Sequence, residues 1–512
     1  MSTEPVLDVD DIQGMIIPGY RKPAQDLLHF RISDPAAARL WLAQFSSRVA
    51  SAAETNGQHR RFKALTQSLG REPSQFDALF YGAALSATGL RKLVQNGDVD
   101  TFGDASFTAG LAASSPTLGD PTNGPGSPDE WVIGGNTNPV DVMLVVAADD
   151  AEKVETATNC LIDEIRQAGL ENIHIDHGRE RPDEQAGHEQ FGFKDGISMP
   201  SVRGLNGPGG AFFEPRQQDA VGYDGLVTES FARPGVPLLW PGQVLFGYAR
   251  QDANDPASAK PGDVPIGPSW SKNGSFLVFR RLRQDTLAFE GFIDDSVQAL
   301  NNQGWTPPLV SETLAARLMG RWKSGAPISL YPDGDPGRQA VTNDFGFANQ
   351  RPVEAADHRK INQNDDTDGL ICPRGAHIRK VNPRDLSTDR GPARRTLMRL
   401  PLRRGITYDA TQTNGDAPSH DKGLLFIAFH SSIEDSFEFL MKTWIRHIER
   451  PEDQGGFDPV LSRGDGRFVY LNNNGHTFKL PVPGGWITPT GGEYMFMPSK
   501  SFLKSLGSTP MA

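Results

Sequence analysis

A histidine stands between two prolines in a short segment that is rich in basic side chains. His377 lies between Pro373 and Pro383, whose rings restrict the backbone on both sides and can hold the imidazole in one orientation. The basic residues of this segment are Arg374, Arg379, Lys380 and Arg384. Such a cationic patch in an acidic chain requires an anion to balance its charge. The residues alone fit a basic surface loop with a hydrogen-bonded histidine equally well.

An aspartate flanked by glycines is the second candidate for chemistry. Asp195 follows Gly192 and precedes Gly196 in the segment QFGFKDGISMP. The glycines allow close approach of the backbone, and the apolar neighbours would exclude water. A carboxylate in these surroundings is either an acid–base group with a shifted pKa or an ordinary turn residue. On this segment alone, the turn is the better interpretation.

Sequence motifs of several common enzyme classes are absent. The chain contains no G-x-x-x-x-G-K-[ST] loop, no G-x-G-x-x-G after an expected strand, no H-E-x-x-H and no G-x-S-x-G. These absences argue against nucleotide binding, a zinc protease and an α/β-hydrolase. The two cysteines, Cys160 and Cys372, are too few for a disulfide framework or a four-cysteine metal site.

Taken together, the two candidate segments resemble those of the dye-decolorizing peroxidases, a family of haem enzymes. The matching motifs are GFKDG at residues 192–196, CPRGAHIRKVNPR at 372–384 and LRRGI at 402–406, with DIQG at 11–14 and GSFLV at 274–278 also similar. The resemblance extends from about residue 10 to about residue 500 and is strongest around Asp195, His377 and Arg403. The longer C-terminal half is similar to that of the longer bacterial and fungal members.

The resemblance implies that the chain binds haem b in its C-terminal half. His377 matches the proximal ligand of the iron, which binds through a neutral imidazole nitrogen. The other ring nitrogen should donate to a carboxylate that makes the ligand more electron-rich. Asp458 is the candidate for this carboxylate, and Glu434 and Asp435 are the alternatives.

On the opposite face of the haem, the resemblance implies two catalytic residues. Asp195 matches the residue that takes a proton from peroxide and returns it to the leaving oxygen. Arg403 matches the arginine whose permanent charge stabilises negative charge during peroxide cleavage, and Arg404 is the alternative. Leu424 and Phe426 match apolar positions of the distal wall, a role that is compatible with ordinary core packing.

Three further site residues depend on the resemblance. Arg379 and Arg384 are expected to bind the haem propionates, which would supply the anions that the basic segment requires. A surface position is the alternative for either arginine. Because bulky substrates cannot enter a closed haem pocket, electrons would pass through a Tyr or Trp side chain. Tyr408 is the expected electron relay, and packing beside the pocket is its alternative role.

The implied function is a haem peroxidase that uses hydrogen peroxide to oxidise dyes and phenolic compounds through a ferryl intermediate. Its partners would be peroxide and small aromatic reductants, and a homo-oligomer is compatible with the resemblance. A non-enzymatic haem carrier or sensor is the alternative, although a carrier requires His377 and neither Asp195 nor Arg403. An acidic scaffold without haem is the third hypothesis.

Four segments show the elements that must position these residues. In each, an apolar run typical of a strand is followed by a polar turn and a helical pattern. The expected strands are 27–32, 140–146, 275–282 and 424–429, and the expected helices are 36–46, 150–165, 285–292 and 431–448. The pattern occurs twice before about residue 200 and twice after about residue 236, which predicts two α+β halves, each an antiparallel sheet with helices on one face.

The family resemblance implies the same fold class, an α+β fold of two ferredoxin-like domains. The expected boundaries are an N-terminal domain at 1–203, a Gly- and Pro-rich crossing at 204–235, and a haem-binding C-terminal domain at 236–512.

Composition limits the partners of the chain. Its 512 residues carry 51 Lys and Arg against 63 Asp and Glu, a net charge of −12, which argues against sequence-independent nucleic-acid binding. The longest apolar runs have six or seven residues, whereas a membrane-spanning helix needs about 20. The N-terminal sequence MSTEPVLDVDD lacks a basic and then apolar run, so no secretory signal is visible and a cytoplasmic location is expected.

Overall fold

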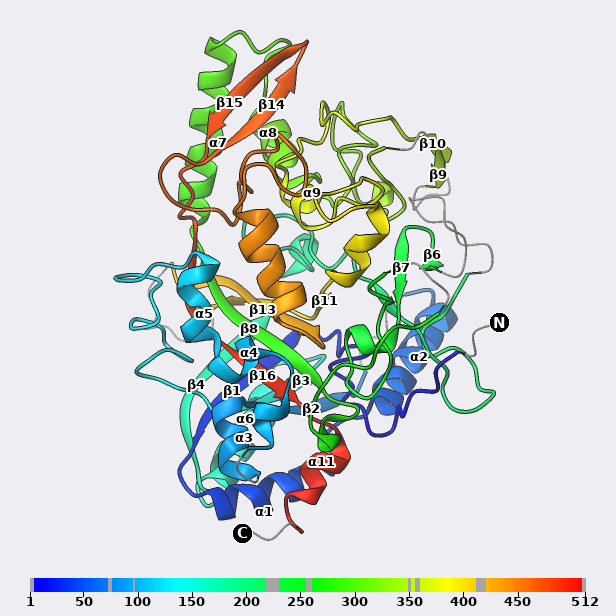
Figure 1. Cartoon of the computed structure of the whole chain (residues 1–512), viewed down its shortest axis with the longest axis vertical. Helices are drawn as coiled ribbons and strands as arrows, with labels where there is room; N and C mark the ends of the chain where they lie inside the picture. Colours follow the sequence, from blue (N-terminus) through cyan, green and yellow to red (C-terminus); the bar gives the residue numbers. More distant parts are fainter. Residues whose placement is uncertain are drawn as a thin grey trace.

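The computed structural model describes residues 4–71, 76–94, 97–217, 230–254, 260–348, 351–354, 360–410 and 420–508. Its centre is a large antiparallel sheet, with helices packed around it and long loops gathered at one end (Figure 1). None of the helices in these ranges has both the length and the hydropathy that crossing a bilayer requires.

The N-terminal half forms a four-stranded sheet in the order β4-β1-β3-β2. Its elements are β1 (Ala24–Ile32), α1 (Pro35–Phe45), α2 (Ala52–Leu69), β2 (Leu79–Ser86), α3 (Ala87–Leu93), α4 (Ala105–Ala109), α5 (Leu111–Leu118), β3 (Val142–Ala148), α6 (Ala151–Ile165) and β4 (Leu170–Arg179). Asp34 and Asp150 cap α1 and α6 by accepting backbone N–H groups of their first turns. The predicted strand–helix pairs at 27–46 and 140–165 are confirmed.

The C-terminal half repeats this plan with β8 at the centre of its sheet. β8 (Ser275–Gln284) pairs with β13 (Lys422–His430) on one side and with β16 (Ile487–Met497) on the other. β12 (Ile406–Asp409) and β11 (Leu402–Arg403) both pair with β13. α7 (Thr286–Asn302) follows β8 and continues ten residues beyond the predicted helix end at 292, because its apolar residues keep facing the core as far as Leu300.

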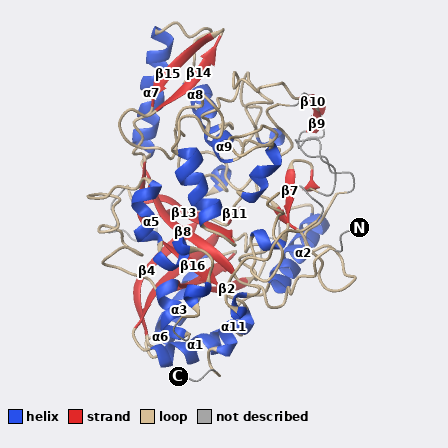
Figure 2. Cartoon of the chain, viewed as in Figure 1, coloured by secondary structure: helices blue, strands red, loops and turns tan. Residues whose placement is uncertain are grey.

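Two seams join the halves into one closed barrel. Phe496 and Met495 of β16 pair with β2, and Tyr408 of β12 pairs with Gly178 of β4. A side chain at Gly178 would collide with the Ile406 methyl group, so glycine allows β12 to approach β4. The two ferredoxin-like halves therefore share a continuous sheet (Figure 2). The expected boundaries at 203 and 236 stay a prediction.

Alternate strand residues face the two sides of the barrel wall. Leu27, Met143, Leu277 and Leu425 pack together inside the barrel. The strand residues that point to the outer face of the barrel, including Leu28, pack against the surrounding helices. A closed sheet leaves fewer unpaired strand edges than two separate sheets would.

The remaining elements form the loop-rich end and the periphery. They are β5 (Ser201–Val202), β6 (Phe231–Arg233), β7 (Val236–Leu239), α8 (Ser311–Met319), β9 (Pro352–Glu354), β10 (Lys360–Asn362), α9 (His377–Val381), β14 (Phe468–Asn473), β15 (His476–Pro481) and α11 (Lys500–Ser505). Short 3-10 turns occur at Val99–Thr101, Asp183–Gln185, Pro241–Gln243, Ser269–Ser271, Arg338–Ala340 and Ala393–Met398.

Candidate active site

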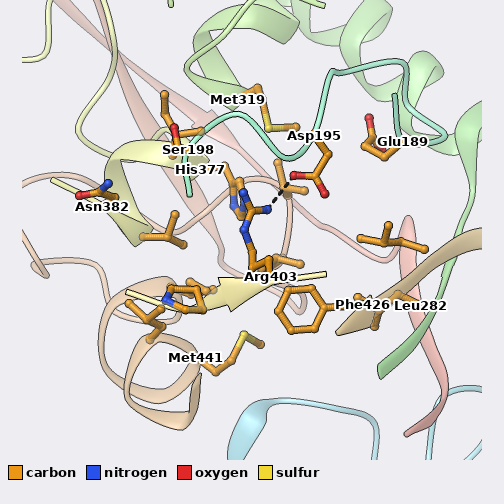
Figure 3. Close-up of a pocket in the computed structure, with 18 of the residues that line it drawn as sticks. Glu189, Asp195, Ser198, Leu282, Met319, His377, Asn382, Arg403, Phe426 and Met441 are labelled. Carbon is orange, nitrogen blue, oxygen red and sulfur yellow. Dashed lines mark hydrogen bonds and ion pairs between the residues drawn. The ribbon is translucent and has the colours of Figure 1, made fainter. Parts of the chain in front are cut away.

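A cavity lies on the outer face of the C-terminal part of the barrel wall, between β8, β13, α9 and the loop that contains Asp195. His377, Asp195 and Arg403 all line it, although the sequence separates them widely. Much of the remaining wall is apolar, including Leu282 on β8 and Phe426 on β13 (Figure 3). Polar groups converging in an apolar cavity are typical of a ligand or cofactor site.

His377 is the first residue of α9, and a buried carboxylate fixes its ring. Its Nδ1 lies 2.8 Å from Oδ2 of Asp458, which leaves Nε2 for a ligand in the cavity. Oδ1 of Asp458 accepts the backbone N–H groups of Val460 and Leu461 at 2.8 and 2.9 Å. The carboxylate is thus held from one side by the backbone and orients the imidazole from the other.

In the His377–Asp458 pair, burial and the attraction between the two charges shift the pKa values in opposite directions. Burial favours the neutral forms, but the Asp458 carboxylate raises the pKa of His377 above its ordinary value. His377 and the two backbone N–H groups in turn hold the pKa of Asp458 below its ordinary value, against the effect of burial. The alternatives Glu434 and Asp435 are exposed, and they bind Ser106 and Arg399 instead.

Asp195 and Arg403 form an ion pair in the same cavity. Nη1 of Arg403 donates to Oδ1 of Asp195 at 2.7 Å (Figure 3). The same oxygen accepts the backbone N–H of Gly196 at 2.6 Å, and Gly196 has a φ of 75°, a conformation that favours glycine. Enclosure in the cavity disfavours the charged carboxylate, but Arg403 and this N–H hold its pKa below the ordinary value.

A glutamate not predicted from the sequence supports the Asp195 loop. Oε1 of Glu189 accepts the backbone N–H of Phe193 at 2.8 Å, and Oε2 accepts that of Phe191 at 2.9 Å. Gln284 of β8 also donates to Oε2. These bonds tie the loop to the barrel wall. Burial, reinforced by the nearby Asp195 charge, raises the pKa of Glu189.

Arg404 points away from this cavity. Its Nη1 and Nη2 donate to the backbone oxygens of Arg403 and Ile16 at 3.0 and 3.2 Å. It does not line the cavity that contains His377, whereas Arg403 does. The structure therefore places Arg403 in this cavity and Arg404 outside it, and the distal role of Arg403 stays a prediction.

Leu424 and Phe426 face the cavity because of the strand alternation of β13. Leu425 and Ile427 point into the barrel and are fully buried, so the alternating residues Leu424 and Phe426 face outward. Both Leu424 and Phe426 line the cavity. This face of β13 therefore forms part of the apolar wall of the cavity, and its role on the distal side of a haem stays a prediction.

Guanidinium groups lie at another part of the wall. Nη1 of Arg384 donates to the backbone oxygens of Asn343 and Phe345, each at 3.0 Å. Arg321, which the sequence analysis missed, is 5% exposed and lines the cavity as well. It lies outside the matching motifs, and no pattern around it pointed to a ligand. The cavity thus combines an imidazole, apolar walls and buried cations.

Comparison with known proteins identifies the family. A family model, the DyP dimeric alpha+beta barrel domain, matches residues 11–182. The protein "Dye-decolorizing peroxidase msp1" of Mycetinis scorodonius is 31% identical over 523 residues, which cover 98% of this chain and 88% of that protein. The chain belongs to the dye-decolorizing peroxidase family. It is accordingly a haem peroxidase that acts on dyes.

Solved structures of the family share the fold. An ancestral D-type dye-decolorizing peroxidase has 31% sequence identity and a TM-score of 0.74, covering 98% of this chain and 99% of that chain. A dye-decolorizing peroxidase in complex with 2,6-dimethoxyphenol has 28% identity and a TM-score of 0.71, covering 98% and 100%. The predicted α+β class with ferredoxin-like halves is therefore confirmed.

The cavity fits the haem of a dye-decolorizing peroxidase. His377 offers a ring nitrogen toward the cavity while its other nitrogen is engaged by Asp458. The apolar wall suits a porphyrin, and the buried guanidinium groups suit its carboxylates.

The structure corrects the prediction for Arg379. Its Nε and Nη2 donate to the two carboxylate oxygens of Glu452 at 2.8 and 2.7 Å, and it does not line the cavity. It follows His377 by two positions on α9, so the two side chains point about 200° apart around the helix. Arg379 therefore stabilises the surrounding loops and does not contact a propionate.

Tyr408 also lies apart from the cavity. It is 2% exposed and packs with the residues inside the barrel. Its hydroxyl donates to Oδ1 of Asp421 at 3.2 Å, and the Arg281 guanidinium lies 4.2 Å from its ring centroid. Burial and the nearby carboxylates raise the pKa of its hydroxyl, although Arg281 opposes this. A relay role for Tyr408 stays a prediction.

The helix after β13 is wound more loosely than predicted. Glu434–Glu438 and Leu440–Ile445 are π-helical, and Glu438 N–H donates to the oxygen of Ile433, five residues earlier, at 2.9 Å. The predicted helix was expected to reach residue 448. Phe437, Leu440 and Met441 of this stretch line the cavity. π-helical turns are rare and are frequent at functional sites, and no sequence pattern indicated this one.

Proposed function

We propose that the protein binds haem b through His377 and reduces hydrogen peroxide with Asp195 and Arg403 to oxidise dyes and phenols. The observation that carries this proposal is the presence of the His377–Asp458 pair and the Asp195–Arg403 pair in one cavity. A haem carrier requires the first pair alone.

His377 and Asp458 would hold the cofactor. A hydrogen bond from Nδ1 to Asp458 directs the ring and keeps Nε2 as the electron-rich ligand atom. When bound, the haem would supply the iron that binds peroxide, and it would hold the oxidising equivalents of peroxide until substrates consume them. Met319 and Met441 add apolar contacts to the cavity wall and exclude water from it.

Asp195 and Arg403 would cleave peroxide. The ionised Asp195 accepts a proton from one peroxide oxygen and donates it to the other, so that the second oxygen leaves as water. Arg403 stabilises the negative charge that develops on the oxygens during this transfer. Their ion pair keeps Asp195 in the ionised form that the first proton transfer requires.

A second cavity offers a route for peroxide. Asp195 and Arg403 line both cavities, and the second cavity continues from them past Arg404 to Arg21 and Arg233. Arg21 and Arg233 are exposed, so this cavity reaches the protein surface. Peroxide entering there would meet the Asp195–Arg403 pair first.

The direct test measures turnover by the haem-loaded protein. With hydrogen peroxide and 2,6-dimethoxyphenol, the phenol should be oxidised and peroxide consumed, as followed by the phenol's absorbance. An anthraquinone dye should lose its colour under the same conditions. A haem absorption band without peroxide consumption would instead indicate a carrier, and no band after haem addition would indicate a scaffold.

Arg403→Gln is expected to move the acid limit of the peroxide reaction to higher pH. Asp195 must be ionised, and its pKa lies below the ordinary value of 3.8, so the reaction is lost only as the pH falls through that lowered pKa. Without the Arg403 charge, the effect of enclosure in the cavity on Asp195 is less opposed, and the pKa of Asp195 rises.

This shift is measured as the midpoint of the rate of haem absorbance change after mixing with peroxide, between pH 3 and pH 7. Arg48→Gln is the matched control, because it removes the same charge from an exposed pair with Glu164. An unchanged midpoint in Arg403→Gln would contradict the assigned role of the ion pair.

A further inference from the structure

Glu189 closes a tight turn shortly before Asp195, with its backbone as well as its side chain. Its N–H donates to the backbone oxygen of Phe193 at 3.0 Å, and its own backbone oxygen accepts the Gly192 N–H at 2.9 Å. Its carboxylate oxygens accept the N–H groups of Phe193 and Phe191 at 2.8 and 2.9 Å. These four hydrogen bonds hold the turn in one conformation.

The backbone on either side of this turn is paired, and Asp195 lies at the end of the pairing. The Asp195 N–H donates to the backbone oxygen of Gly187 at 2.9 Å. Between them and the turn, His188 forms an antiparallel β-bridge with Lys194. Residues 187–195 therefore form a short hairpin. Because its two sides are bonded to each other, a change in the conformation of the turn shifts Asp195 as well.

Gln284 anchors this hairpin to the barrel wall. It is the last residue of β8 and is 4% exposed. Its Nε2 donates to Oε2 of Glu189, and its Oε1 accepts the Gln190 N–H at 3.4 Å. Gln284 also lines the cavity that contains His377. The bonds to its amide group therefore fix the position of the hairpin relative to the cavity wall.

Glu189 and Asp195 are two carboxylates on one loop with different partners (Figure 3). Both line the cavity that contains His377 and the second cavity as well. Within the described residues, the groups that donate to the Glu189 carboxylate are two backbone N–H groups and the Gln284 amide, and none of them is charged. Bonds from such groups to a charged carboxylate are roughly twice as strong as bonds to a neutral oxygen. Glu189 thus binds the backbone, whereas Asp195 pairs with Arg403.

We infer that Glu189 is a positioning residue of the peroxide reaction, which aims the Asp195 carboxylate by holding the turn that precedes it. This inference rests on the proposed function, because that proposal assigns the proton transfers to Asp195. A general base must lie within about 2.6–3.2 Å of the group whose proton it takes. A misplacement of about 1 Å can slow such a step about 100-fold, so the hold on the turn affects the rate without any contact between Glu189 and peroxide.

Glu189→Gln should slow the reaction of the haem-loaded protein with hydrogen peroxide about 10- to 100-fold. Glutamine has one acceptor oxygen, so its NH2 group would face another donor, either an N–H of the turn or the Gln284 amide. The measurement is the second-order rate constant of the haem absorbance change after rapid mixing. Reduction of the peroxide-treated protein by 2,6-dimethoxyphenol should keep its rate, because that electron transfer does not use Asp195.

Amide hydrogen exchange provides a readout that does not depend on turnover. In Glu189→Gln the N–H groups of the turn are held less firmly, so a peptide spanning residues 187–196 should exchange faster. The measurement uses mass spectrometry on the full chain, with and without haem. Glu54→Gln is the matched control, because Oε2 of Glu54 accepts the Ser51 N–H at 2.6 Å at the start of α2 and Glu54 lines neither cavity. It should change neither the peroxide rate nor the exchange of residues 187–196.

A peroxide rate in Glu189→Gln equal to that of the Glu54→Gln control would overturn the inference. Equal losses in the peroxide rate and in the rate of reduction by the phenol would also overturn it, because they would assign Glu189 a general structural role. Gln284→Met removes the anchor from the side of the barrel and should slow the peroxide step by a smaller factor, so an unchanged rate there would count against the inference too. If the wild-type holoprotein does not react with peroxide, the proposed function fails, and that result is distinct from these.

Discussion

Asp195→Asn is expected to slow the reaction of the haem-loaded protein with peroxide by about 10²- to 10⁴-fold, the usual contribution of a positioned acid–base group. Asparagine keeps the size of the side chain and can still accept the Gly196 N–H, but it cannot take a proton from peroxide. The measurement is the second-order rate constant of the haem absorbance change after rapid mixing.

A matched control separates this effect from loss of a carboxylate elsewhere. Asp285 is exposed and caps α7 through a bond to the Ala288 N–H at 3.0 Å, and it does not line the cavity. Asp285→Asn should leave the peroxide rate within about twofold, because asparagine is as good a helix cap as aspartate. If Asp195→Asn reacted as fast as this control, another group would be the proton acceptor.

His377→Ala is expected to cost the protein more than about 100-fold in haem affinity. Replacement of an outer partner of a metal ligand typically costs 10–100-fold, and loss of the ligand itself should exceed this. The measurement is a haem titration followed by the absorption band of the bound haem. Added imidazole should partly restore binding, because it can occupy the space that the ring leaves.

Asp458→Asn provides the graded comparison. It keeps a hydrogen-bond acceptor for Nδ1 but removes the negative charge, so the loss of haem affinity should fall in the 10–100-fold range. Unaltered haem binding in His377→Ala would place the cofactor elsewhere and contradict the proposed site.

The strand–helix pairs were predictable from local sequence, whereas the roles of the site residues followed from the family resemblance and stay predictions. Period-2 alternation in β13 placed Leu424 and Phe426 on one face, and Asp34 and Asp150 marked the starts of helices. Short-range patterns of this kind depend on neighbours in sequence, which a single chain displays directly.

Contacts between distant segments were less predictable. Asp458 could be named only as one of several carboxylates near His377, because no pattern states which loop returns to α9. Arg379 was misassigned since the basic cluster was visible in sequence but its partner Glu452 was not. Arg321 went unnoticed because the surroundings of an arginine side chain are visible only in three dimensions.

Closure of the barrel determines when this protein can complete its folding during synthesis. β2 and β4 are the outer strands of the N-terminal sheet, and both wait for partners from the C-terminal half, β16 and β12. Chains grow at about 5–20 residues per second, so some 400 residues separating β2 from β16 take roughly 20 to 80 seconds to emerge. Throughout that interval the edge of β2 is unpaired and could pair with strands of other nascent chains. The ribosome-bound protein therefore needs another molecule or segment to cover this edge until β16 has been made.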